Sequence, residues 1–570
     1  MGSALPDPPS APGLRRGLAI LVIAALLFGV WRAAELAWIC DDAFISLRYA
    51  QNLVLGNGLV YNPGEYVEGY TNLLWTLALA AAMALGAPDV ASAEWLGIAA
   101  YLATALLLLH ASWRRHLRAG TAFLPLAAGV LLVSPDFHEW ASGGLETSLF
   151  GALALAGMLA SRHAARTGRG AFGAGVLLSL LTLTRPDGLL FAAAAAAGLL
   201  WDGRRREGVR LLVPVLLTVV LWSLWKGFYY GELLPTAFHS KSVLRPYYAQ
   251  GLIYLGLFLA RNWFLPLALI GIGLWRVRRG GAAAPAQRDA WVLGGSALLY
   301  LAYVVHVGGD FMFGRRILPA LPLGLLALET GLSSLQPARA RTLAALACVV
   351  AAALPYPIYG DGRARIRGVA DERRFHTDEA LALRRQQAEA VGTALAGSPA
   401  RVVYEGGMCV FGYYSELPYL VEMSGLTQYS LAKLPLERRG WVGHEKRATE
   451  AWLAANDIHL IMSHRFPPIP RPHGQRPVEL VYFGDLAVAR IERYDPAVMD
   501  VLRTTPGVSF VPIEETLARK RREIERASPQ RAEEILAWLE RFYFDGVGAA
   551  ATEEAAALRE LVAQRRASVR

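Results

Sequence analysis

The sequence predicts a polytopic α-helical membrane protein with about eleven transmembrane helices and a C-terminal extracytoplasmic α/β domain. Of its 570 residues, 54% are hydrophobic and only 18% are charged, whereas ordinary soluble domains carry about 25% charged residues. Apolar runs near the length of about 20 residues that a spanning helix needs alternate with short Arg-rich segments. Residues 359–570 break this pattern and mix strand-like runs with helix-like runs, which indicates a separate α/β domain.

The apolar runs define the predicted spans. We place them at residues 15–36, 91–111, 121–135, 141–160, 171–184, 187–201, 210–228, 258–276, 290–307, 315–333 and 341–358. With the N-terminus inside, every short Arg-rich loop falls on the cytoplasmic side, as the positive-inside rule requires. The first run follows Arg15 and Arg16 and lacks a small-residue cleavage site, so we expect a retained signal anchor. The division into domains is then 1–358 for the transmembrane catalytic part and 359–570 for the extracytoplasmic part.

Charge decides two ambiguous segments. Residues 72–86 are apolar but short, and treating them as an interfacial or re-entrant helix keeps the Arg114–Arg118 cluster inside. Residues 171–201 are interrupted by Arg185-Pro186-Asp187-Gly188, and Pro-Asp-Gly is turn chemistry. We therefore expect a tight hairpin of two short helices, which puts the Arg clusters on either side of it inside.

Composition also excludes some functional classes. The net charge of +10 could suggest a nucleic-acid partner, but most of the Arg excess lies beside apolar spans, so we expect no nucleic acid. The three cysteines, Cys40, Cys348 and Cys409, are too few for a disulfide framework.

With this topology, unusual ionisable residues gather in the outer loops, at or near helix ends. Charge at membrane depth is costly and indicates a functional site. The candidate catalytic residues are Asp41 and Asp42; the candidate ligands of a donor phosphate are Arg185, Lys241, Arg315 and Arg316; the candidate substrate-binding residues are Arg48, Glu68, His138, Glu146, His239 and Asp310.

The chemistry that fits these groups is transfer from a phosphate-linked carrier. A carboxylate at the membrane surface can deprotonate an acceptor hydroxyl, and arginines can stabilise a departing lipid phosphate. Of the adjacent acids we favour Asp41 as base, with Asp42 orienting it, binding a sugar hydroxyl or holding a cation. No metal motif is present, but a calcium or magnesium ion held by Asp42 or Glu146 stays open as a cofactor.

Each candidate also has a purely structural interpretation. Asp41 and Asp42 could cap the helix predicted over 43–55, and Glu146 could cap the helix that follows it. Arg185 could be an interfacial residue with its charge drawn to the water, and His138 could be a surface histidine.

At these residues the chain resembles the GT-C glycosyltransferases, a polytopic class that uses lipid-phosphate sugars and has acids in its first outer loop. A narrower resemblance is to the mycobacterial terminal β-(1→2)-arabinofuranosyltransferases. The matching segments are Asp41 to Arg48, Gly56 to Glu68, Ser142 to Glu146, Arg185 to Asp187, Gly308 to Arg315, Asp371 to Phe375 and Gly443 to Lys446.

The resemblance implies an inverting arabinofuranosyltransferase of cell-wall synthesis in the bacterial plasma membrane. Its donor would be decaprenyl-phosphoryl-arabinose, its acceptor an arabinan, and its base an acid of the Asp41-Asp42 pair. Three alternatives remain: transfer of another sugar such as mannose, transport of a lipid-linked sugar, and a glycan-binding scaffold. Transporters place polar sites near the bilayer midplane, whereas here the span centres are nearly free of charge, which favours an enzyme.

Overall fold

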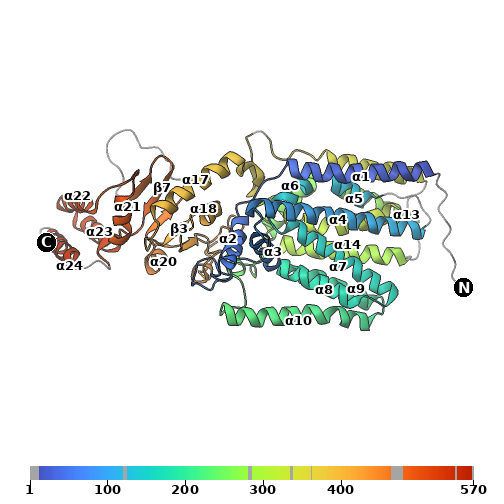
Figure 1. Ribbon diagram of the computed structural model, residues 1–570, viewed down its shortest axis with the longest axis horizontal. Coiled ribbons are helices and arrows are strands. Elements are labelled where there is room, and N and C mark those ends of the chain that lie inside the picture. Colours follow the sequence, from blue (N-terminus) through green and yellow to red (C-terminus); the bar gives the residue numbers. More distant parts are fainter. Residues whose placement is uncertain are drawn as a thin grey trace.

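The computed structural model describes residues 12–119, 125–279, 285–333, 338–360, 362–463, 479–545 and 549–567. It consists of a long helical region and a C-terminal region built on a mixed sheet. In Figure 1 most long helices, among them α1, α4, α10 and α14, run along the longest axis, and the C-terminal region continues beyond one end of them. The short helices α2 and α3 lie at the junction.

The helical region follows the apolar runs of the sequence. Its elements are α1 (Pro12–Glu35), α2 (Ala43–Val54), α3 (Leu73–Ala84), α4 (Asp89–Ala119), α5 (Leu126–Val133), α6 (Pro135–Ser142), α7 (Thr147–Thr167), α8 (Ala171–Thr184), η1 (Pro186–Gly188), α9 (Leu189–Trp201), α10 (Arg205–Tyr229), α11 (Thr236–Ser240), α12 (Tyr248–Arg261), α13 (Phe264–Arg279), α14 (Pro285–His306), η2 (Leu318–Ala320), α15 (Leu321–Leu332) and α16 (Ala338–Ala353). The short helix expected over 72–86 is α3, and the two helices expected over 171–201 are α8 and α9, with Pro186–Gly188 between them.

By length and composition, two of the described helices can cross a membrane, at Asp89–His116 and Arg205–Tyr229. Two bent pairs, α6 with α7 and α12 with α13, would bring that number to four if each pair is one span. The helix α10 has the apolar exposed surface expected of a helix in lipid. Its residues Leu216, Leu221 and Phe228 are all exposed, and it is apolar around most of its surface. The protein is thus a membrane protein with several apolar helices, and the number of about eleven spans stays a prediction.

Three predicted spans differ from the structure. The span expected over 258–276 is broken after α12, because Arg261 and Asn262 turn to bind Asp136, at 2.7 and 3.0 Å, and the chain bends by 85°. The span expected over 141–160 is replaced by α6 and α7, which meet at 110° around the turn that contains Gly144 (φ +74°). Only Leu126–Val133 of the span expected over 121–135 is the helix α5, and residues 121–124 lie outside the described part of the chain.

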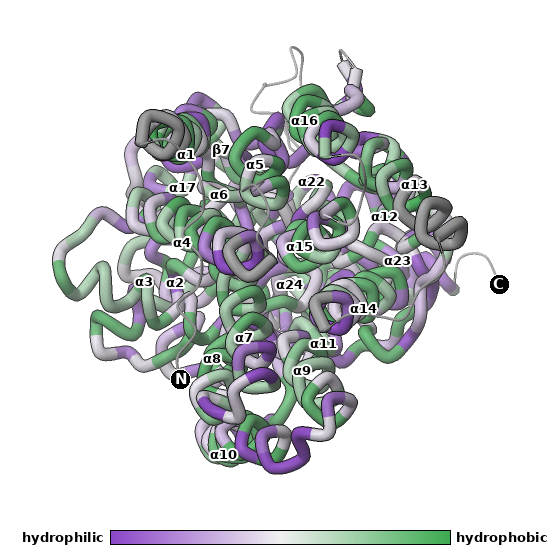
Figure 2. Tube along the Cα trace, turned by 90° about the vertical axis from the view of Figure 1, so that its right-hand side faces the viewer, coloured by the Kyte–Doolittle hydropathy of each residue, from purple (hydrophilic) through white to green (hydrophobic). Residues whose placement is uncertain are grey.

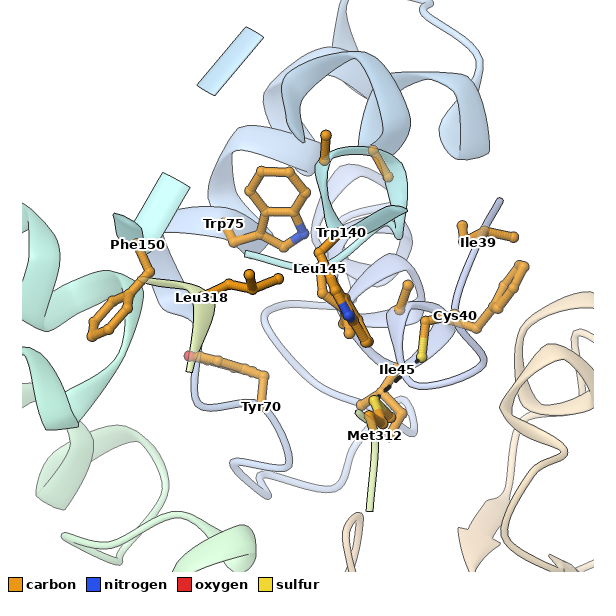
Figure 3. Close-up of a cluster of buried hydrophobic side chains, with 14 of the residues drawn as sticks. Ile39, Cys40, Ile45, Tyr70, Trp75, Trp140, Leu145, Phe150, Met312 and Leu318 are labelled. Atoms are coloured by element: carbon orange, nitrogen blue, oxygen red, sulfur yellow. Dashed lines mark hydrogen bonds between the residues drawn. The ribbon is translucent and has the colours of Figure 1, made fainter. Parts of the chain in front are cut away.

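The junction is held by a buried aromatic core, shown in Figure 3. The indole N–H of Trp75 donates to the carbonyl of Gly144 at 3.1 Å, and that of Trp140 donates to the carbonyl of Phe313 at 2.9 Å. Buried indole groups need such partners. The two bonds fasten the loop before α7 and the loop after α14, and these loops carry the charged residues discussed below.

The C-terminal region contains a six-stranded sheet of order β4-β3-β5-β7-β6-β8. In it β3 pairs parallel with β4 and β5, and the other pairs are antiparallel. Its elements are β1 (Arg365–Ile366), β2 (Val369–Ala370), η3 (Glu372–Phe375), α17 (Asp378–Ala394), β3 (Val402–Tyr404), α18 (Cys409–Tyr414), β4 (Leu420–Glu422), α19 (Tyr429–Ala432), α20 (Glu450–Ala455), β5 (Leu460–Met462), β6 (Leu480–Phe483), β7 (Ala487–Ile491), α21 (Pro496–Thr504), β8 (Val508–Phe510), α22 (Ile513–Arg526), α23 (Pro529–Leu539), η4 (Glu540–Phe544) and α24 (Ala549–Ala567). The mixed sheet agrees with the predicted α/β class; the boundary at residue 358 and the extracytoplasmic location stay predictions.

Candidate active site

Asp41 and Asp42 lie in the connection between α1 and α2, where they face different ways. Asp41 is buried, and its two carboxylate oxygens accept the backbone N–H groups of Cys409 and Val410, at 2.9 and 3.2 Å. These are the first residues of α18, so Asp41 caps a helix of the C-terminal region. Each oxygen of Asp41 thus already accepts one backbone N–H, although the residue also lines the cavity described below. Its assignment as the base stays a prediction.

Asp42 is the more exposed of the two acids. Its side chain is 21% exposed and lines a cavity, and its nearest cation is Arg315, at 3.7 Å. It precedes α2 but makes no capping bond to that helix, so the capping interpretation does not apply to it. Of the two acids that line this cavity, Asp42 is therefore the less constrained by the surrounding protein.

Arg315 links three of the predicted acids. Its guanidinium lies 3.7 Å from Asp42, 3.6 Å from Glu146 and 3.7 Å from Asp310, and Arg316 lies 3.4 Å from Asp310. These distances exceed those of good hydrogen bonds. The Nε of Arg315 is buried without a hydrogen-bond partner, and the buried Nε of Arg316 has only the 3.4 Å ion pair with Asp310. Both arginines thus have donor capacity that the surrounding protein does not use.

Arg185, by contrast, has hydrogen-bond partners for most of its donors. It forms a two-pronged pair with Asp187, at 2.9 and 3.1 Å, and donates to Glu146 at 2.9 Å. Glu146 also accepts from Asn72 at 2.9 Å and makes no capping bond to α7. Arg185 is therefore an ordered part of the network, but its donors are largely taken by carboxylates.

Lys241 completes the cationic side of the site. It is half-buried, and it lies close to Gly443 and Phe311 at the edge of the C-terminal region. Burial, together with Arg316, lowers the pKa of Lys241, while Asp310 and Asp42 act against that shift. The lysine therefore shares the field of the Arg315, Arg316 and Asp310 cluster.

A cavity of about 440 Å³ opens on the other side of Asp42, between the loop after α1 and the C-terminal region. Its lining combines apolar side chains, such as Phe311 and Trp441, with many polar ones. The polar residues from the C-terminal region are Arg365, Glu372, His376, Arg384, Glu405, His444, Lys446 and Arg447. Such a surface suits a ligand with many hydroxyl groups. Burial lowers the pKa of His444, so its imidazole is neutral near pH 7.

Several predicted site residues lie elsewhere and have structural partners. Arg48 donates to the carbonyls of Tyr61 and Leu417, each at 2.7 Å, and so ties α2 to the C-terminal region. Glu68 pairs with Lys226 at 2.8 Å. His138 contacts the carbonyl of Leu132 at 2.9 Å and packs between Phe28 and Tyr101.

His239 is not among the residues that line the cavity of Asp42. Its backbone carbonyl accepts from Lys446 at 2.9 Å, so it supports a cavity residue without facing the cavity itself. Sequence reasoning missed the polar lining from Arg365 to Arg447. The one signal that pointed to it was the pair of resembling segments at Asp371–Phe375 and Gly443–Lys446, which contribute Glu372, His444 and Lys446.

One group of side chains could be considered for a metal ion, namely Asp41, Asp42 and Cys409, whose ligand atoms lie within 4.8 Å of one another. Calcium and magnesium prefer oxygen ligands, and each oxygen of Asp41 already accepts one backbone N–H. Burial and the neighbouring acids raise the pKa of the Cys409 thiol, which keeps it protonated. The group therefore offers such an ion two carboxylates and no third oxygen ligand.

No protein-family model matches the chain. In sequence it is 30% identical over 412 residues to the terminal β-(1→2)-arabinofuranosyltransferase of Mycobacterium tuberculosis, covering 62% of this chain and 64% of that protein. It is 28% identical over 349 residues to the protein of the same name from Corynebacterium glutamicum, covering 54% of this chain and 50% of that protein. The chain thus spans between half and two thirds of the length of these relatives.

Among solved structures, the chain is similar to ArnT from Cupriavidus metallidurans. The TM-score is 0.41 at 18% identity for the form bound to undecaprenyl phosphate, over 77% of this chain and 79% of that one. For the apo form the TM-score is 0.48 at 13% identity, over 79% and 94%. The resemblance drawn from the sequence motifs is confirmed: the chain is a distant relative of the terminal β-(1→2)-arabinofuranosyltransferases.

Proposed function

We propose that this protein is a membrane glycosyltransferase that moves a sugar from a polyprenyl-phosphate donor to a glycan acceptor outside the cytoplasm. The observation that carries the proposal is the pair Arg315 and Arg316 beside Asp42 and Asp310. The buried Nε of Arg315 has no hydrogen-bond partner, and the carboxylates lie 3.4 to 3.7 Å from the two guanidinium groups. Guanidinium groups match phosphate oxygens well. A phosphate bound there would supply the missing acceptors and lie next to the exposed carboxylate.

In this mechanism Asp42 is the general base. It faces the polar cavity, where an acceptor hydroxyl would lie, and its other neighbour is the arginine that would hold the departing phosphate. The hydroxyl would attack the anomeric carbon, its proton would pass to Asp42, and the polyprenyl phosphate would leave with the bonding electrons. Because a single displacement occurs on one face of the sugar, the anomeric centre would be inverted.

The remaining charged groups hold Asp42 and Arg315 in place. Arg315 makes its closest carboxylate contacts at 3.6 to 3.7 Å, and Glu146 is itself fixed by Arg185 and Asn72 at 2.9 Å each. Lys241 adds positive potential from the opposite side. In low-dielectric surroundings, preorganised charge of this kind stabilises a developing anion strongly.

The sugar that we propose is arabinofuranose, carried as decaprenyl-phosphoryl-arabinose, with an arabinan of the cell wall as acceptor. This choice rests on the two sequence relatives, which carry that activity in their names. The polar lining of the cavity, with Glu405, His444 and Arg447 among its residues, is compatible with a glycan acceptor. A mannosyl or other glycosyl donor is the competing choice.

The test is transfer by the purified full chain in detergent or nanodiscs. Radiolabelled decaprenyl-phosphoryl-arabinose and polyprenyl-phosphoryl-mannose are supplied in parallel with arabinan and mannan oligosaccharides. We expect label in the arabinan only with the arabinose donor. Transfer only from the mannose donor would overturn the choice of sugar, and transfer from neither donor, with binding of neither, would overturn the proposed activity.

A further inference from the structure

A second and larger cavity, of about 790 Å³, opens between the helices far from Asp42. It is bounded by the C-terminal halves of α4 and α7, the residues that follow α9, the start of α14 and the second half of α15. Nothing in the proposed transfer reaction uses these residues. The cavity therefore needs an explanation of its own.

The two cavities lie at opposite ends of the helical region. Asp289, which lines the second cavity, is at the start of α14, and Asp310 of the charge network follows the end of that helix. The 22 residues of α14 correspond to a length of about 33 Å, close to the thickness of about 30 Å of a hydrocarbon core. With α14 as the span that the sequence predicts over 290–307, the second cavity is expected at the level of the headgroups of the opposite leaflet. Figure 2 views this end of the protein, and hydrophilic segments lie near the labels α7, α10 and α14.

The cavity has an excess of positive charge. Among the described residues, two aspartates, Asp202 and Asp289, line it together with a larger set of arginines, of which Arg115 is paired with Glu329 next to the lining. These arginines are Arg114, Arg115, Arg162, Arg166, Arg204 and Arg288. The acids are shared, because Arg162 binds both Asp202 and Asp289, at 2.5 and 2.8 Å, and Arg166 binds Asp289 at 2.7 Å.

That sharing leaves other arginines with donors for a ligand. Arg288 comes no nearer than 4.0 Å to Asp202. The Nε of Arg204 donates to a backbone carbonyl, that of Ala165, at 2.9 Å. Arg114 is exposed at the rim. A site with this balance of charge favours an anion, and several guanidinium groups together favour a phosphate.

The inner walls of the cavity are apolar. They are formed by Leu107, Ala111, Leu159, Leu177 and Leu293. A small inorganic anion would leave this apolar surface exposed to water. An amphiphile can place its acyl chains against this surface and its headgroup between the arginines. Basic pockets between transmembrane helices are known to suit lipid headgroups.

We propose that this cavity binds the phosphate headgroup of an anionic phospholipid from the leaflet opposite the Asp42 site. The headgroup phosphate contacts Arg114, Arg204 and Arg288 at the rim, and the acyl chains lie against the apolar walls. The site is separate from the donor site and does not depend on which sugar is transferred.

The test measures lipid binding to the purified full chain by native mass spectrometry and by the change in Tm. The probes are phosphatidylglycerol, phosphatidylcholine with the same acyl chains, and inorganic phosphate. We expect phosphatidylglycerol to bind and to raise Tm, because a ligand of the native state stabilises it, and we expect neither effect from phosphatidylcholine. Stabilisation by inorganic phosphate equal to that by phosphatidylglycerol would overturn the lipid assignment, as would equal binding of both lipids.

A matched pair of variants locates the site. Arg114→Gln with Arg288→Gln removes two exposed lining arginines, and Arg206→Gln with Arg210→Gln removes two exposed arginines of the same end that do not line the cavity. We expect the first double variant to weaken phosphatidylglycerol binding by roughly tenfold or more, since each basic residue near an anionic headgroup contributes strongly. Equal losses in both double variants would overturn the proposal, because they would indicate a diffuse electrostatic effect.

The Ala160→Phe variant, which fills the apolar wall, should also lower lipid affinity, and unchanged affinity would contradict the placement of the acyl chains.

Discussion

At the residue scale, two adjacent acids have different tasks. The sequence points to the pair Asp41-Asp42 as the centre of the site. It cannot say which acid does which, because the partners of Asp41 are the N–H groups of Cys409 and Val410, 368 and 369 residues later. The same limit applies to Arg48, whose carbonyl partners include Leu417. The local sequence shows that a charged residue stands at an unusual position. Its hydrogen-bond partners depend on the tertiary structure.

A buried carboxyl near the site gives a prediction about pH. Burial raises the pKa of Glu422 to about 7, with Asp42 adding to the shift and the N–H groups of Ser424 and Leu426 opposing it. Between the ordinary pKa of 4.5 and about 7, the folded protein holds a proton that the unfolded chain releases, so stability falls as pH rises through this window. We expect the Tm of the wild-type protein to fall from pH 5 to pH 8, through a loss of roughly 1–3 kcal/mol.

The Glu422→Gln variant should lose the share of this pH dependence that Glu422 contributes, while Glu68, whose pKa burial also raises to about 7, keeps its own share. The variant Glu437→Gln, at an exposed position, should keep the wild-type slope. Thermal unfolding of the full chain at several pH values measures both. A Glu422→Gln protein with the same slope as the wild type would show that Glu422 is ionised in the fold at neutral pH.

At the element scale, the sequence predicts where helices form better than where they break. The interfacial helix α3 and the pair α8 and α9 were placed by apolar length and by the Pro-Asp-Gly turn, both of which are local signals. The break after α12 was missed because it depends on Asp136, which lies 125 residues from Arg261 in the chain. The bend between α6 and α7 was missed although Gly143-Gly144 stood there as a local signal.

Packing between α8 and α10 gives a prediction at this scale. A side chain at Gly175 would collide with the backbone carbonyl of Leu211 on α10, whereas one at Gly173 would meet nothing within 4 Å. Small residues let membrane helices approach closely. We expect Gly175→Leu to destabilise the protein by about 1–3 kcal/mol or more and Gly173→Leu to leave the Tm nearly unchanged. Equal Tm values for the two variants would contradict the packing of these helices.

At the scale of the whole molecule, the arrangement places one charged site at each end of the helical region. The Asp42 site lies where the helices meet the C-terminal region, and the arginine-lined cavity lies at the other end. Composition and the clustering of arginines predict this polarity, since arginines mark the cytoplasmic side. The cavity of Asp42 could not be predicted in the same way, because most of its lining comes from a region with weak sequence signals, such as Glu405 and Arg447.

Topology is testable because the three native cysteines are buried and free. We expect a cysteine introduced by Arg114→Cys to resist a membrane-impermeant thiol reagent in intact cells and to react after permeabilisation. A cysteine introduced by Glu450→Cys, at a side chain that is 72% exposed, should react in intact cells. Labelling of both or of neither in intact cells would contradict the placement of the two ends on opposite sides of the membrane.

The central claim is that Asp42 is the base and Asp41 is an anchor. The most direct measurement compares transfer by Asp42→Asn and Asp41→Asn, using whichever labelled polyprenyl-phosphoryl sugar the wild-type protein accepts. We expect Asp42→Asn to lower kcat by at least roughly 10²-fold with little change in the KM for the donor, since general-base help contributes about 10²–10⁴-fold. We expect Asp41→Asn to keep most of kcat but to lower the Tm, because it weakens the cap of α18. Near-normal turnover in Asp42→Asn would contradict the account, and so would a loss of turnover confined to a stably folded Asp41→Asn protein.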